Sequence, residues 1–186
     1  MESEKPKVDR WLVLRDLSRP NAKNPAYKAL QSMPGMEEDL FIPMKRQAYV
    51  QGGKRLVREV PYMYDLIFVR RTREELDMLL VKLSGLQYRY RRGCKITDTL
   101  SVADAEMSRF KKAVESADIV EYFTPAEVPL ELYGKKIRIV GGKLDGITGR
   151  LMTKQGSKVK RLIIDLEECN LSAAVQVESE YIQLVK

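Results

Sequence analysis

The acidic and glycine-rich segments of this 186-residue chain give little support for catalysis. Its acidic clusters, Glu37-Glu38-Asp39 and Glu167-Glu168, consist of adjacent residues on predicted loops, where carboxylates are usually solvated rather than arranged for acid–base chemistry. The chain contains no histidine, the commonest general base and metal ligand. Gly141-Gly142-Lys143 lacks the spacing and the following hydroxyl of a Walker loop. We therefore expect a protein that is not an enzyme and that holds no cofactor or metal.

The rest of the composition predicts a soluble, cytoplasmic protein. No apolar run approaches the roughly 18 to 20 residues that a membrane helix needs. The first ten residues are mixed in charge and lack the apolar core of a signal peptide. Cys94 and Cys169 are far apart without a cysteine or histidine nearby, so we expect free, reduced thiols. The net charge of +7 favours a polyanionic environment such as nucleic acid.

Residues 11–117, which follow a flexible lead over 1–10, alternate apolar strands with amphipathic helices. Strands are predicted at 11–14, 40–50, 54–60, 64–69 and 86–92. Helices are predicted to start at Asn24-Pro25, at the capping box of Thr72 with Glu75, and at Ser101 with Asp104. The first should end at Pro34-Gly35 and carry Tyr27 and Leu30, the second should bury Leu76, Leu79, Leu80 and Leu83, and the third should bury Met107, Phe110 and Val114.

A basic hairpin is predicted between the second and third of these strands. Gln51-Gly52-Gly53-Lys54 has the composition of a hairpin tip. The flanking segments carry five basic residues: Lys45, Arg46, Lys54, Arg55 and Arg58. A second basic pattern follows in 86–92, where Tyr88 and Tyr90 alternate with arginines. A buried aromatic face and a nucleic-acid contact both explain that spacing.

Short strands alone are predicted from residue 135 onward. They cover 136–140, 149–154, 159–166, 172–177 and 181–185, and glycine-rich turns separate them. Five short strands in so small a segment predict a β-barrel over 135–186. Pro125, Pro129 and Gly134 mark 118–134 as a linker. The expected fold class is therefore α+β, with two domains.

The segment from Lys136 to Arg150 resembles a KOW motif, with Ile137, Ile139, Ile147 and Leu151 expected to point inward around its glycines. Before it, the order of elements with a basic hairpin resembles the N-terminal (NGN) domain of the NusG family of transcription elongation factors. Leu40-Phe-Ile-Pro43 and Val60–Val69 fall where that family has its second-strand pattern and its Phe-Pro-Gly-Tyr element. The resemblance implies an antiparallel sheet flanked by helices, followed by a five-stranded SH3-like KOW barrel.

The chain departs from the general NusG pattern at several positions. Tyr64-Asp65 replaces Pro-Gly, Met63 replaces Phe, and Leu66 replaces Tyr. In these features and in Thr72–Asp77 the chain is similar to specialised NusG paralogues of Bacteroides-type bacteria, which antiterminate capsular polysaccharide operons. The resemblance implies antitermination by a monomer bound to transcribing polymerase on the nucleoid. The alternatives are a general housekeeping factor and a KOW-type RNA- or ribosome-binding protein that is independent of polymerase.

The resemblance also implies three binding regions. The polymerase clamp helices would contact Trp11, Tyr62, Met63, Tyr64 and Leu66, although Trp11 and Leu66 fit a core role equally well. The five basic hairpin residues would contact the polymerase lobe, the non-template DNA or nascent RNA, or would simply be solvated. Leu144 and Ile147 would bind Rho or a ribosomal protein. Leu144 takes a place where the general factor often has Phe, so our hypothesis is that Rho is not bound.

Overall fold

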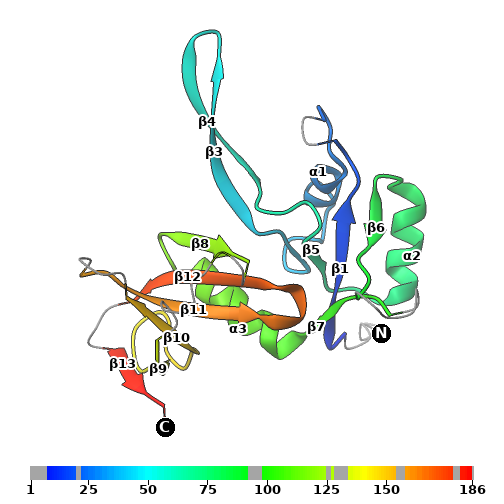
Figure 1. The fold of residues 1–186 in the computed structure, drawn as a ribbon. Helices are drawn as coiled ribbons and strands as arrows, with labels where there is room; N and C mark the ends of the chain where they lie inside the picture. The colour runs from blue at the N-terminus through cyan, green and yellow to red at the C-terminus, as the bar shows by residue number, and fades with distance from the viewer. Residues whose placement is uncertain are drawn as a thin grey trace. The chain divides into compact units, whose positions relative to one another are not determined.

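The computed structural model describes residues 8–19, 22–91, 98–124, 127, 134–153, 158–177 and 181–185. Residues 1–7, Arg92, Cys94 and, within the predicted linker, residues 125, 126 and 128–133 lie outside these ranges. The chain is an α+β protein with antiparallel sheets, and it divides into two compact units, Met1–Asp104 and Ala105–Lys186 (Figure 1). Within the described ranges, no helix is both long and apolar enough to cross a bilayer.

The first unit is built on a sheet with β1 at its centre (Figure 1). Its elements are β1 (Arg10–Asp16), α1 (Ala26–Gln31), β2 (Leu40–Phe41), β3 (Met44–Gln51), β4 (Lys54–Pro61), β5 (Ile67–Val69), α2 (Arg73–Lys82), β6 (Leu86–Tyr88) and β7 (Ser101–Ala103). The strand order is β2-β5-β1-β6, and β7 also pairs with β1. β6 pairs with the second half of β1, from Leu14 to Asp16, and β7 pairs with its first half, from Arg10 to Leu12.

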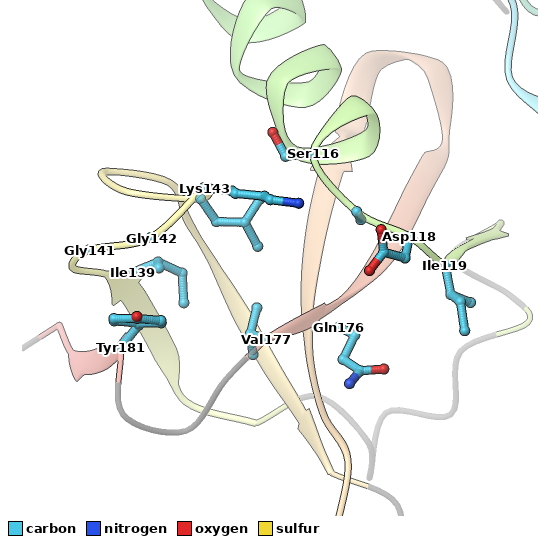
Figure 2. Close-up of a pocket in the computed structure, with 12 residues that line it drawn as sticks. Ser116, Asp118, Ile119, Ile139, Gly141, Gly142, Lys143, Gln176, Val177 and Tyr181 are labelled. Atoms are coloured by element: carbon cyan, nitrogen blue, oxygen red, sulfur yellow. The ribbon is translucent and has the colours of Figure 1, made fainter.

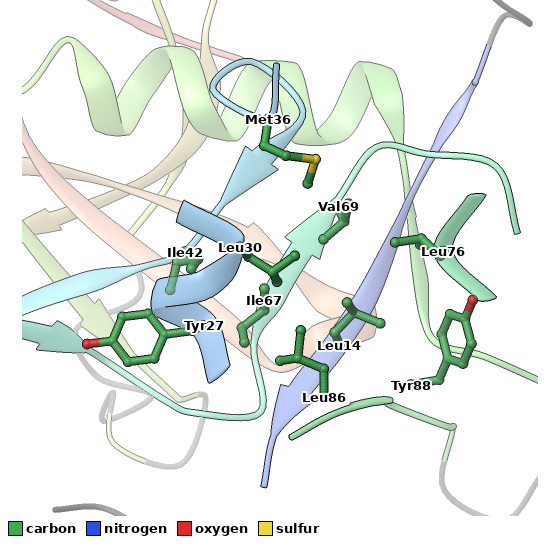
Figure 3. Close-up of a cluster of buried hydrophobic side chains, with 10 residues drawn as sticks. All are labelled: Leu14, Tyr27, Leu30, Met36, Ile42, Ile67, Val69, Leu76, Leu86 and Tyr88. Atoms are coloured by element: carbon green, nitrogen blue, oxygen red, sulfur yellow. The ribbon is translucent and has the colours of Figure 1, made fainter. Parts of the chain in front are cut away.

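A cluster of buried apolar side chains joins this sheet to α1 and α2 (Figure 3). The cluster consists of Leu14, Tyr27, Leu30, Met36, Ile42, Ile67, Val69, Leu76, Leu86 and Tyr88. Leu79, Leu80 and Leu83 of the α2 face pack against it while remaining partly exposed. The predicted apolar faces of α1 and α2 are therefore confirmed, and their burial holds these short helices on the sheet.

The predicted capping box at α2 is confirmed. The Thr72 hydroxyl accepts a hydrogen bond from the Glu75 amide at 3.2 Å, and the Glu75 carboxylate accepts one from the Thr72 amide at 2.9 Å. These reciprocal bonds satisfy two of the amides that a helix start leaves without partners. A local sequence pattern is enough to set this helix start.

The start of α1 differs from the prediction, since Pro25 rather than Asn24 is the N-cap and no side chain of the cap residue bonds to the helix. The first amides are instead satisfied from the end of β1. Asp16 accepts from the Tyr27 amide at 2.8 Å, and Ser18 accepts from the Ala26 amide at 3.1 Å. The cap of α1 is therefore tertiary, which a local pattern does not reveal.

The predicted start of the third helix is also wrong at Ser101. That residue lies in β7, where it pairs with Leu12, and its hydroxyl accepts a hydrogen bond from Arg10 Nε at 2.9 Å. α3 (Asp104–Glu115) begins directly after the strand. Its buried residues are Met107, Phe110 and Ala113, while Val114 of the predicted stripe is half-buried. Pairing with β1 overrides the capping preference of Ser101.

The predicted strand over 40–50 is divided by Ile42 and Pro43, which lie outside β2 and β3. Proline has no amide hydrogen to donate to a sheet, so a strand interruption here is expected. The predicted hairpin is confirmed. β3 and β4 pair with each other as a separate sheet, and Gly52 and Gly53 have φ of 58° and 76° at its tip. Both angles favour glycine over any residue with a side chain.

The second unit contains a single described sheet with the order β13-β9-β10-β11-β12-β8. Its elements after α3 are β8 (Val120–Phe123), β9 (Lys136–Ile139), β10 (Thr148–Thr153), β11 (Lys160–Leu166), the 3-10 helix η2 (Glu167–Cys169), β12 (Leu171–Val177) and β13 (Ile182–Leu184). The five strands predicted after residue 135 are confirmed. β8, which lies inside the predicted linker, adds a sixth strand by pairing with β12.

Candidate binding surfaces

Two of the residues predicted to bind polymerase are buried. Trp11 is 2% exposed and Leu66 is fully buried. The Trp11 indole donates a hydrogen bond to Asp104 Oδ1 at 2.8 Å, and the Arg70 guanidinium lies 5.5 Å from the Trp11 ring centroid. The structure therefore places Trp11 and Leu66 beneath the surface, where they contribute packing rather than direct contact area.

The other three residues of that prediction form a continuous, partly exposed segment between β4 and β5. Backbone hydrogen bonds fix it: the Tyr62 amide donates to Pro43 O and the Asp16 amide donates to Tyr64 O, both at 2.7 Å. The Tyr64 ring also packs edge-on against Tyr27 at a centroid distance of 6.1 Å. Tyr62, Met63 and Tyr64 are named the aromatic loop below, and they offer a preformed apolar contact surface.

The acidic run that begins at Glu37 has a structural role at its last residue. Asp39 is paired with Arg70, at 2.9 Å, and with Arg71. Arg70 also approaches Asp104 at 3.5 Å. Arg70 and Arg71 thus pair with Asp39 and Asp104, as expected for partly buried charges in a scaffold, and Arg70 and Asp104 of this group also contact Trp11.

The basic hairpin has its cationic side chains directed to solvent. Lys45, Arg46, Lys54, Arg55 and Arg58 are all exposed. Within the part of the chain that the structure describes, none of the five forms a salt bridge. These exposed charges are therefore available to a polyanion or an acidic protein surface.

The aromatic pattern after α2 belongs to the core at Tyr88, which is 5% exposed. Its hydroxyl donates to Asp77 at 2.8 Å, and the Arg73 guanidinium lies 4.0 Å from its ring centroid. Arg89 pairs with Asp65 at 3.4 Å. Of the two explanations of this pattern, the structure supports the buried face for Tyr88, while Arg92 lies outside the described residues.

Alkaline pH should reveal the burial of Tyr88. Desolvation, followed by the hydrogen bond to Asp77, raises the pKa of its phenol far above the usual value of about 10. The folded state favours the neutral phenol. The contribution of Tyr88 to folding stability is therefore fully present below pH ~10 and is lost as the pH rises through the raised pKa. We expect Tyr88→Phe to cost about 1 kcal/mol at pH 8. Urea unfolding should show that the difference in unfolding free energy between the unsubstituted protein and Tyr88→Phe narrows above pH ~10. A difference that stays the same at all pH values would contradict the burial of the Tyr88 phenol.

The second unit contains a cavity of about 410 Å³ between the end of α3, the turn after β9 and the end of β12 (Figure 2). Ile139, Leu144 and Val177 supply apolar lining, and Asp118 and Lys143 add opposite charges. Leu144, one of the two residues predicted to bind a further protein, is a lining residue of this cavity. Ile147 is 2% exposed and does not line the cavity, so it supports the wall from within.

Tyr181 is a cavity residue that sequence reasoning missed. Its ring lies against Gly141 and Gly142, where an added Cβ would come within 3.0 to 3.2 Å of ring atoms. Both glycines have positive φ, 101° and 68°. The adjacent glycines signalled a tight turn, but only the pairing of β13 with β9 brings Tyr181 to that turn. The cavity can accept an apolar side chain flanked by polar groups.

No group of three or more acidic, cysteine or histidine residues arranged to hold a metal ion is found among the described residues. Cys169 is a buried thiol that forms no disulfide. The candidate surfaces are the aromatic loop, the basic hairpin and the cavity. Compared with models of known protein families and with curated protein sequences, the chain gives no match.

Proposed function

We propose that this protein is a NusG-like transcription factor that binds RNA polymerase and promotes processive elongation, specialised for antitermination in long surface (capsular) polysaccharide operons. The observation that carries the proposal is the preformed aromatic loop at the base of an exposed basic hairpin. An apolar loop fixed by backbone bonds provides binding area at little entropic cost. A second unit, which contains α3 and a sheet of short strands, follows it in the chain.

In the proposed mechanism the aromatic loop binds the clamp helices of polymerase, and the hairpin reaches the opposite lobe or the nucleic acid in the cleft. Such a bridge resists clamp opening and so suppresses pausing. The cavity beside Leu144 would receive an apolar side chain of a further protein, in the region proposed for Rho or a ribosomal protein. Leu144 lacks the aromatic ring of the Phe that the general factor often has at this place, so we expect no Rho binding.

Met63→Asp should abolish polymerase binding without unfolding the protein. The substitution places a charge in the middle of the aromatic loop, and a buried unpaired charge is costly at an interface. Met78→Asp is the matched control, because Met78 lies on α2 with 63% exposure. Pull-down with purified polymerase and Trp11 fluorescence measure binding and folding. Retained binding by Met63→Asp, or equal loss in the control, would count against the aromatic loop.

Specialisation is tested by co-purifying the tagged protein with polymerase from its native host and sequencing the nascent transcripts in the complex. Transcripts from a few long polysaccharide operons would support specialised antitermination, and transcripts from most genes would indicate a general factor.

An RNA- or ribosome-binding protein is the second candidate, because β9 exposes Lys136 and Arg138 on its outward face. Co-purification with ribosomal RNA in high salt, without polymerase, would favour it.

A further inference from the structure

The cross-strand register of the hairpin sorts its side chains onto two faces. Residues directly opposite each other in an antiparallel pair share a face. Three such pairs are Gln47 with Arg58, Tyr49 with Leu56, and Gln51 with Lys54. These six residues, with Lys45, form what we call the tyrosine face. The other side, called the valine face, consists of Arg46, Ala48, Val50, Arg55, Val57 and Glu59.

The tyrosine face combines positive charge with the aromatic ring of Tyr49. Lys45, Lys54 and Arg58 give it three positive charges, and it carries no acidic residue. The Arg58 guanidinium lies 5.2 Å from the Tyr49 ring centroid and donates to Gln47 Oε1 at 3.0 and 3.2 Å. At the base of the hairpin, Lys45 Nζ lies 5.3 Å from the centroid of the Tyr62 ring. Tyr49 therefore lies between Lys54 and Arg58 along this face, and Lys45 lies beside Tyr62 at its base.

The valine face has a different chemistry. Val50 and Val57 are 73% and 65% exposed. Arg46 is opposite Glu59, so one of its two arginines has an acidic neighbour across the strands. The net charge of this face is +1, against +3 on the tyrosine face. Two sides of one ribbon thus differ in charge and in aromatic content, although their sequences are interleaved.

We propose that the tyrosine face is a binding site for single-stranded nucleic acid. Its cations would neutralise successive phosphates, and Tyr49, held by Arg58, would stack on an unpaired base. A duplex would not serve equally, because its bases are stacked on one another and leave no ring face for Tyr49. This site refines the hairpin contact of the proposed function. Oligonucleotide binding is measured without polymerase, so a failure of this proposal can be distinguished from a failure of polymerase binding.

The test compares variants of the full-length protein that remove equal charge from opposite faces. Lys54→Ala/Arg58→Ala changes the tyrosine face, and Arg46→Ala/Arg55→Ala is its control on the valine face. Anisotropy of labelled single-stranded DNA, single-stranded RNA and duplex DNA of one sequence is measured over a range of salt. The tyrosine-face variant should lose affinity and lower the salt slope by about 0.7 for each lost phosphate contact. The control should change both far less.

Tyr49→Leu tests stacking separately from charge. It should weaken single-strand binding at least about fivefold while leaving the salt slope unchanged. The preference between DNA and RNA identifies the natural strand. Equal losses of affinity in the two double variants would mean that overall positive charge alone explains the binding, and would overturn the proposal. Duplex binding as tight as single-strand binding, or no binding by the unsubstituted protein at low salt, would also overturn it. Circular dichroism checks that each variant remains folded.

Discussion

Gly149→Ala is expected to destabilise the second unit by about 3 kcal/mol, near the upper end of the cost of overpacking a core. Gly149 lies in β10 opposite Ile137 of β9. An added Cβ would lie 2.3 Å from the backbone oxygen of Ile163 and 2.8 Å from Leu162 Cδ1. Relief of the first clash requires backbone movement, because a carbonyl oxygen has no rotamer to change.

Hydrogen exchange can locate this loss. Protection of the β10 and β11 amides should fall in Gly149→Ala, while Trp11 fluorescence in the first unit should keep its urea midpoint. Gly146→Ala is the control, since Gly146 has φ +80° but open space around its Cβ position. Backbone strain alone should cost it about 1 to 2 kcal/mol. If the two variants were equally destabilised, the close approach of Gly149 to β11 would not be the cause.

The elements that the sequence predicts correctly are those with a local cause. The capping box needs only Thr72 and Glu75, and the hairpin tip needs only two adjacent glycines that accept positive φ. The strands after residue 135 alternate or carry apolar runs between turns. The missed features depend on distant partners. β8 exists because β12 pairs with Val120–Phe123, and Ser101 becomes part of a strand because β1 lies beside it.

The candidate surfaces show the same division. The hairpin's exposure could be predicted, because five basic residues around a tight turn cannot all be buried. The burial of Trp11 and Leu66 could not, since a core residue and an apolar contact residue have the same side-chain chemistry. The sorting of the hairpin into two faces requires the register, which the Gly52-Gly53 turn sets. The cavity could not be foreseen at all, because α3, β9 and β12 meet there.

Asp16 connects the fold of the first unit to its aromatic loop. Its carboxylate accepts from the amides of Ser18, at 2.7 Å, and Tyr27, at 2.8 Å. Its own amide donates to Tyr64 O. One residue at the end of β1 therefore fixes the start of α1 and the backbone of the aromatic loop. The start of α1 therefore depends on the Asp16 side chain, whereas the direct bond to the aromatic loop comes from the Asp16 backbone amide, which a substitution at this position keeps.

Asp16→Ala should lower the stability of the first unit by about 3 kcal/mol, because two hydrogen bonds to a charged group are lost. Asp16 is only 7% exposed, so water cannot fully replace them. Urea unfolding followed by Trp11 fluorescence measures the change. Arg15→Ala is the control, because Arg15 lies next to Asp16 in β1 but is exposed and bonds Gln87 at the surface. In the absence of urea, Asp16→Ala should also bind polymerase more weakly, since α1 no longer supports Tyr27 against Tyr64. If the unfolding free energy of Asp16→Ala were unchanged, α1 would be held by its apolar face alone.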